Sequence, residues 1–311
     1  MIWLLFRLTA YALVLFLLFR ARTSVDWRHL FSRARTEGTG PNTLTVAGDD
    51  LAPELVGGLL ARYGLDYPRV RVIRQGGGTL PALEQLINRR CDVAFTLRPV
   101  SPAEQRLFLE TTGDTVLVTR IALGGLVILA TADQPRAALG LADLSQLART
   151  GPLATIDRLY APDPNSGLWA AFRNGLSPEE PDSLHGPNVI FLADEAAVIA
   201  AVAGDSRSLG LGSSLSLPEN LAARGVRVMP LSGADSAPVL PDYETIGNAH
   251  YPLFHYLYAA SRPGGGLEGS MFITHLTSVR GQRQIERAGY LPAQQALRVV
   301  VLSTDPIGAP K

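Results

Sequence analysis

The chain has 311 residues, of which 47% are hydrophobic and 18% are charged, so it is long enough for one large or two medium globular domains with real cores. This composition excludes a disordered or fibrous protein. Lysine plus arginine and aspartate plus glutamate each number 28, so no global positive field favours nucleic acid as a partner. Cys91 is the only cysteine, which excludes an intrachain disulfide and a Cys-x-x-Cys metal or redox pair.

Residues 1–22 are expected to form a transmembrane anchor. The run from Ile2 to Phe19 is mostly apolar and is broken by Arg7. At about 1.5 Å per residue it would form a helix of roughly 27 Å, which is close to the thickness of the hydrocarbon core of a bilayer. The sequence after it, "RARTS", offers no small-x-small cleavage site. We therefore expect an uncleaved anchor, with a signal peptide as the alternative.

Residues 23–41 are expected to form a juxtamembrane amphipathic segment that ends in a Gly/Pro/Thr linker. Ser24 can cap a short helix that carries Trp27, Leu30 and Phe31 on one side and arginines on the other. Such a helix suits the membrane surface. A polar linker is the alternative interpretation.

From residue 42 onward, short apolar runs alternate with helical patterns. Strands are predicted at 43–48, 69–75 and 91–97, and helices at 52–64 and 79–90. The same alternation continues through 124–130, 141–150, 167–175, 188–193, 194–205, 208–213 and 226–231. A strand at 254–260 and one helix at 269–289 follow near the end. This alternation implies a largely parallel sheet with helices on both faces.

Four stretches between residues 42 and 292 resemble the periplasmic phosphate-binding proteins, the solute receptors of phosphate ABC importers. "YPLFHYLYAASRP" at 251–263 is similar to that family's Tyr-Pro-Leu segment and the aromatic strand after it. "FITHLTSVRGQRQIERAGYLP" at 272–292 is similar to its late helix. "CDVAFTLRPV" at 91–100 is similar to its Asp-x-x-x-Ser-x-Arg-Pro strand end, and "SLGLGSSLSL" at 208–217 to its Ala-Ile-Gly-Tyr turn.

The resemblance implies an α/β, two-lobed periplasmic-binding-protein-like fold with mixed sheets and crossing hinge strands. The expected N-terminal transmembrane helix would precede this fold in the chain. The domain would cover 42–311, with lobe one at 42–121 and 248–311 and lobe two at 122–247. In this family, loop N–H groups and hydroxyls at helix N-termini hold an anion in the cleft between the lobes. Such clefts lie at the carboxyl ends of strands, where open α/β sheets place ligands.

The segment "YAPDPNSGLWAAF" at 160–172 contains the helix start that the resemblance assigns to the anion. Family members have an Arg and a Ser-Gly-Thr triplet there, whereas this chain has Ser166-Gly167-Leu168, with Pro162 at the arginine position. A charge-assisted bidentate contact is therefore missing. Capping of the helix by Asn165 or Ser166 is the competing interpretation.

The other loops depart from the family pattern as well. The loop expected to carry serine reads Gly76-Gly77-Gly78-Thr79, and the strand end expected to supply Asp has Leu97 after Thr96. The loop where the family has threonine reads Gly48-Asp49-Asp50, whose carboxylates would repel an oxyanion. Arg98 either reaches into the cleft or forms a surface salt bridge. A charged hydrogen bond is worth roughly 1.5–3 kcal/mol, so these losses predict weak phosphate binding.

The sequence thus suggests a ligand site but no catalytic or metal site, and no cofactor. The histidines have no His-Glu-x-x-His spacing, and the glycine loop lacks the Lys-Ser/Thr of a P-loop. Ser166 is not in a Gly-x-Ser-x-Gly elbow. The candidate ligand-binding residues are Asp50, Gly77, Gly78, Thr79, Thr96, Arg98, Asn165, Ser166 and Gly167.

These features favour a non-enzymatic, membrane-anchored periplasmic protein of the phosphate-binding-protein fold. We expect an accessory or structural docking subunit of an inner-membrane protein complex with little phosphate affinity, because a freely diffusing receptor needs no tether. The alternative is a phosphate- or other oxyanion-binding component of an ABC importer. The expected partners are the membrane protein complex, the lipid bilayer and a small anion, and not nucleic acid.

The expected location is the inner (cytoplasmic) membrane, with a single pass and the globular domain in the periplasm. The arginine distribution favours the opposite orientation, because positive residues tend to stay on the cytoplasmic side. Arg7 precedes the uninterrupted apolar part, Leu8 to Phe19, whereas five arginines follow it closely: Arg20, Arg22, Arg28, Arg33 and Arg35.

Overall fold

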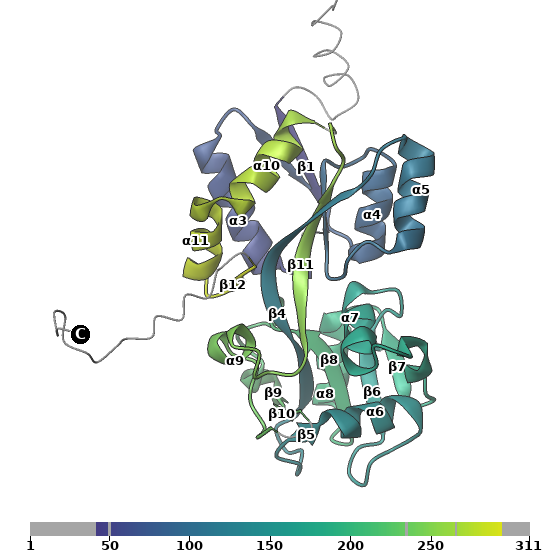
Figure 1. Ribbon diagram of the computed structural model, residues 1–311. Coiled ribbons are helices and arrows are strands. Elements are labelled where there is room, and N and C mark those ends of the chain that lie inside the picture. The colour runs from purple at the N-terminus through teal and green to yellow at the C-terminus, as the bar shows by residue number, and fades with distance from the viewer. Residues whose placement is uncertain (1–41, 49–50, 234–235, 265, 294–311) are drawn as a thin grey trace, which may run out of the picture.

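The computed structural model describes residues 42–48, 51–233, 236–264 and 266–293. The anchor expected at 1–22, the segment expected at 23–41 and the candidate residue Asp50 lie outside these ranges. Within them, no helix is both long and apolar enough to span a bilayer. The described chain forms two α/β lobes, at the top and bottom of Figure 1, that are joined by long strands.

The upper lobe contains elements from both ends of the described chain. Its strands are β1 (Thr43–Ala47), β2 (Arg71–Arg74), β3 (Val93–Thr96) and β12 (Leu291–Pro292). Its helices are α3 (Pro53–Asp66), α4 (Thr79–Ile87), α5 (Pro102–Thr112), α10 (Leu267–Thr277) and α11 (Val279–Arg287). Two strands, β4 (Leu117–Thr131) and β11 (Phe254–Ser261), connect this lobe with the lower one.

The lower lobe is formed by the segment between these two connecting strands. Its strands are β5 (Leu139–Gly140), β6 (Arg158–Pro162), β7 (Val189–Leu192), β8 (Ser208–Ser213), β9 (Val226–Val228) and β10 (Leu231–Ser232). Its helices are α6 (Leu141–Arg149), α7 (Gly167–Leu176), α8 (Glu195–Ala203) and α9 (Tyr243–Gly247), with 3-10 turns η2 (Pro181–Leu184) and η3 (Ala222–Arg224).

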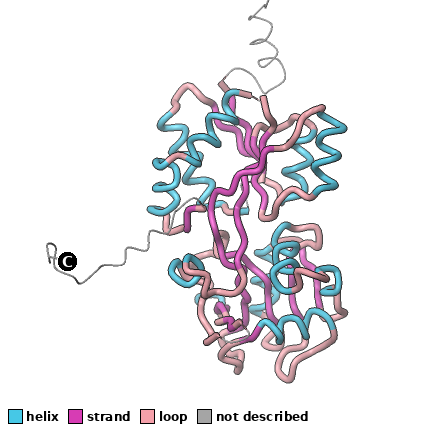
Figure 2. The backbone as a smooth tube through the Cα atoms, in the orientation of Figure 1, coloured by secondary structure: helices cyan, strands magenta, loops and turns pink. Residues whose placement is uncertain are grey.

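One mixed sheet runs through both lobes in the order β2-β1-β3-β11-β4-β8-β6-β7. The outer pairs are parallel, as the alternation of strands and helices predicted. The central pairs of β4 with β11, β8 and β9, and of β11 with β3, are antiparallel. The sheet is therefore mixed rather than largely parallel, because β4 leads into the lower lobe and β11 returns from it (Figure 2).

Helices cover both faces of the upper sheet because successive strand residues point to opposite sides. Leu44 and Val46 share a buried cluster with Phe272 of α10. Ala47 and Ala94, which face the other way, belong to a second cluster with residues of α4 and α5. Figure 1 shows the result, with α3, α10 and α11 on one side of the sheet and α4 and α5 on the other.

The lower sheet is covered in the same way by α7 and α8. Leu209 and Leu211 of β8 share a buried cluster with Trp169 of α7. Gly210, between them, faces α8, where a Cβ atom at this glycine would come within 2.7 Å of Val198. The missing side chain lets α8 lie close against the strand.

The helix expected at 269–289 is interrupted. Ser278 ends α10 and begins α11, with an extended backbone (ψ 157°). Its hydroxyl accepts a hydrogen bond from the N–H of Gly281 at 3.1 Å and so caps the second helix. A Cβ atom at Gly281 would collide with the carbonyl oxygen of His275, so the close turn between the helices depends on glycine there. The single-helix prediction was wrong because the apolar pattern continues through the turn.

Candidate functional site

A cavity of about 720 Å³ lies between the lobes, where α3, α4, α7 and α8 begin. Helix N-termini carry free N–H groups and a partial positive charge. They would therefore attract an anion into this cavity unless nearby carboxylates cancelled their positive charge. The lining residues are Leu51, Pro53, Gly78, Thr79, Leu80, Pro81, Leu97, Pro162, Asp163, Asn165, Ser166, Leu168, Ala193, Asp194, Glu195, Ala196, Ile199, Ser216, Pro218 and Arg224.

The start of α4 supplies two of the candidate residues. Gly78 is the N-cap and, having no side chain, supplies no cap hydrogen bond to the first N–H groups of α4. Thr79 is almost fully buried, and its hydroxyl accepts a hydrogen bond from the N–H of Leu97 at 3.1 Å. Gly77 precedes them with φ +90°, a conformation that favours glycine, and does not line the cavity.

The start of α7 supplies three more candidates. Ser166 is the N-cap, and its hydroxyl accepts a hydrogen bond from the N–H of Trp169 at 3.1 Å. The N–H of Asn165 donates to Asp163 Oδ1 at 2.7 Å. Both Ser166 and Asn165 line the cavity, whereas Gly167 is buried in the contact between the lobes.

Gly167 brings the two lobes into direct contact. A Cβ atom there would collide with Thr79 Oγ1 and would come within 3.1 Å of Leu97 Cβ. The backbone at the start of α7 therefore packs against the end of β3 and the start of α4. The Thr79 hydroxyl, which is bonded to the N–H of Leu97, therefore lies directly against the backbone of Gly167.

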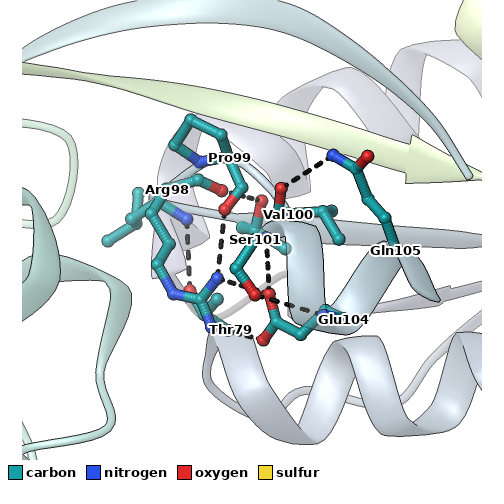
Figure 3. Close-up of polar contacts among 9 residues, drawn as sticks. Thr79, Arg98, Pro99, Val100, Ser101, Glu104 and Gln105 are labelled. Carbon is teal, nitrogen blue, oxygen red and sulfur yellow. Dashed lines mark hydrogen bonds and ion pairs between the residues drawn. The ribbon is translucent and has the colours of Figure 1, made fainter. Parts of the chain in front are cut away.

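Arg98 and Thr96 lie on another side of that contact. Arg98 makes a bidentate ion pair with Glu104, at 2.6 and 2.7 Å (Figure 3). Both side chains are about 17% exposed. Burial would raise the pKa of Glu104, but hydrogen bonds from Arg98 and Ser101 hold it below its ordinary value. Thr96 is fully buried and donates to the carbonyl of Arg98 at 2.8 Å.

A second hollow, of about 490 Å³, is lined by Arg98. Asn165 and Ser166 line this hollow as well as the larger cavity, so the two adjoin at the start of α7. The structure thus brings Gly78, Thr79, Asn165 and Ser166 together at the larger cavity. Arg98, Thr96 and Gly77 are not among its lining residues.

Glu195, a cavity residue that sequence reasoning missed, is the first residue of α8. Its Oε1 accepts from the N–H of Ser213 at 2.6 Å, and its Oε2 accepts from the hydroxyl of Ser216 at 2.5 Å. Burial raises the pKa of this carboxyl to about 7 in spite of these two bonds. The signal in the sequence was the acidic pair Asp194-Glu195, directly after the strand predicted at 188–193 and before an apolar helix.

The charges around the cavity are mainly negative. Asp163, Asp194 and Glu195 line it, and Arg224 is the one basic side chain among the described lining residues. Arg224 is exposed and donates to Asn220 Oδ1 at 3.2 Å. Among the described residues, no group of three or more His, Cys, Asp or Glu is placed to hold a metal ion. The arrangement suits hydrogen bonding to a partly apolar guest better than gripping a dianion.

A family model described as the PBP superfamily domain matches residues 34–279. The fold is similar to a structure from Clostridium perfringens that is described as a phosphate ABC transporter substrate-binding protein with bound phosphate. That match has a TM-score of 0.66 and 16% identity, over 81% of this chain and 100% of the other. No curated protein matches the chain in sequence.

Two further structures share the fold. One is an ABC-type phosphate transport receptor from Vibrio cholerae (TM-score 0.61, 17% identity, 80% of this chain and 99% of the other). The other is the regulatory domain of CcmR from Synechocystis PCC6803 in complex with 2-PG (TM-score 0.51, 16% identity, 76% and 96%). The resemblance to phosphate-binding receptors read from the sequence is therefore confirmed, and the chain belongs to the PBP superfamily domain family.

Proposed function

We propose that this protein is a non-enzymatic, membrane-anchored member of the binding-protein fold that acts as an accessory or docking subunit of an inner-membrane protein complex. Its globular domain would lie in the periplasm, and its cleft would have little affinity for phosphate. The membrane attachment is proposed from the apolar run Ile2 to Phe19, which has the length of a membrane-spanning helix.

The observation that carries the proposal is the charge of the cavity between the lobes. Within the described part of the chain, three carboxyl groups line it against one exposed guanidinium, that of Arg224. Arg98, which was the other candidate cation, is paired with Glu104 at 2.6 Å. A dianion would meet like charge from Asp163 and Asp194, and from Glu195 once that carboxyl is ionised, where a cation would be needed for tight binding.

Calorimetry on the full-length chain in mild detergent tests the weak-affinity part of the proposal. Titration with phosphate, sulfate, molybdate and a phosphonate should give dissociation constants no tighter than about 1 mM. A cooperative thermal transition of the same sample, followed by circular dichroism, shows that it is folded. Replacing Pro162, at the family's arginine position, by Arg should raise phosphate affinity. Micromolar binding of phosphate by the wild type would contradict the proposal.

The docking part is tested separately by purification from native membranes in mild detergent. The full-length chain should co-purify in stoichiometric amounts with an integral membrane protein, which mass spectrometry identifies. A truncated chain that lacks residues 1–35 should no longer be recovered with membranes. A lone monomer in the first experiment would contradict a docking role.

The second candidate function is an oxyanion-binding component of an ABC importer. It is favoured by the likeness in fold to a structure with bound phosphate and by the start of α4, which has no side-chain cap. This candidate requires at least micromolar affinity for an oxyanion and closure of the lobes on binding. The same calorimetry therefore decides between the two candidates.

A further inference from the structure

The cavity between the lobes has aliphatic walls from both lobes. Leu80 and Leu97 line it from lobe one, and Leu168 and Ile199 from lobe two. Its volume of about 720 Å³ is in the range of pockets that enclose small organic molecules. An inorganic oxyanion would leave these walls without a contact, so the chemistry of the walls calls for a ligand with an apolar body.

Among the described lining residues, the acidic groups of the cavity lie in lobe two. Asp163 precedes α7, Asp194 caps α8 and Glu195 begins α8. The exposed Arg224 gives the described lining a single opposing cation. The lobe-two side of the cavity therefore complements a positive charge.

Glu195 retains capacity for a ligand. An ionised carboxylate offers about four acceptor positions. The Ser213 N–H and the Ser216 hydroxyl occupy one position on each oxygen, at 2.6 and 2.5 Å. The remaining positions can accept N–H groups from a cation, and aliphatic surroundings strengthen such a bond because they lower the local dielectric constant.

We propose that this cleft binds a small organic cation, an ammonium group on an aliphatic body. The ammonium group lies against Glu195, and the body lies between Leu80, Leu97 and Ile199. The inference rests on the proposed function in one respect, namely that the cleft does not grip phosphate. A ligand that also carries a carboxylate gains the N–H groups at the start of α4, which Gly78 leaves without a side-chain cap.

Four ligands that separate charge from shape test this inference. Three of them share a branched aliphatic body: isoamylammonium carries an ammonium group, 4-methylpentanoate carries a carboxylate, and leucine carries both. The fourth is phosphate. Calorimetry on the full-length chain in mild detergent should show isoamylammonium or leucine binding at least about tenfold tighter than 4-methylpentanoate. Tightest binding by 4-methylpentanoate, or no binding by any ligand, overturns the cation inference and leaves the proposed function intact. Tight phosphate binding overturns both.

Two variants of cleft residues test whether the ligand binds in the cleft. Glu195→Gln keeps the shape of the side chain and should weaken isoamylammonium binding about 10- to 100-fold. Leu80→Arg puts a cation at a side chain that is 45% exposed, so the fold should tolerate it, and it should abolish isoamylammonium binding while strengthening 4-methylpentanoate. Glu110→Gln, on the exposed surface of α5, is the control and should change neither. Unchanged affinity in both cleft variants overturns the inference.

Discussion

Glu195 makes a pH-dependent contribution to stability that one substitution should remove. Burial at the cavity raises the pKa of its carboxyl from 4.5 to about 7. Each pKa unit corresponds to about 1.4 kcal/mol, so ionisation of this group costs the folded state about 3 kcal/mol relative to the unfolded chain. Because the folded-state pKa is the higher one, the contribution of the neutral Glu195 carboxyl to stability is fully present below pH 4.5. It is lost as the pH rises to about 7, where the group ionises.

Glu195→Gln keeps one oxygen that can accept from the Ser213 N–H, places an amide NH2 group beside the Ser216 hydroxyl, and removes the titration. The unfolding free energy of the wild type, minus that of Glu195→Gln, should therefore fall by about 3 kcal/mol between about pH 4.5 and pH 8. Urea unfolding of the full-length chain in mild detergent, followed by circular dichroism, measures this difference. The same difference for Glu110→Gln should stay nearly constant, because that side chain is exposed. A wild-type-minus-Gln difference that is constant or rises with pH would refute the reasoning.

Three further predictions concern the contacts around the cleft. Burial lowers the pKa of His255 from 6.5 to about 4, so the contribution of the neutral imidazole to stability is present above pH 6.5 and is lost as the pH falls toward 4. His255→Leu should flatten the dependence of the urea-unfolding free energy on pH in this range. An unaltered pH dependence would contradict this prediction. Gly167→Ala should cost about 1–3 kcal/mol, because the new Cβ collides with Thr79; an unchanged melting temperature would mean that the lobes do not touch there. Arg98→Ala should cost about 1 kcal/mol through the loss of its ion pair with Glu104, and urea unfolding at neutral pH without a measurable change would show that the pair adds nothing.

The sequence by itself determined the local elements and the family. The strands predicted at 43–48 and 91–97 and the helix predicted at 79–90 correspond to β1, β3 and α4. Capping by Ser166, one of two interpretations of that segment, is what the structure shows. These predictions succeeded because hydrophobic period and capping depend on residues a few positions apart.

Only the tertiary structure decided the charge of the cleft and the partners of the candidate residues. Glu195 was not predicted because its hydrogen bonds come from Ser213, at the end of β8, and from Ser216 in the turn after it. The choice between cleft and surface for Arg98 depended on Glu104, in a helix that was not among the predicted elements. A hydrophobic period shows which side of a helix is buried, but not which other helix starts beside it. That arrangement depends on how the two lobes and the strands that join them pack, and packing joins residues that are distant in sequence.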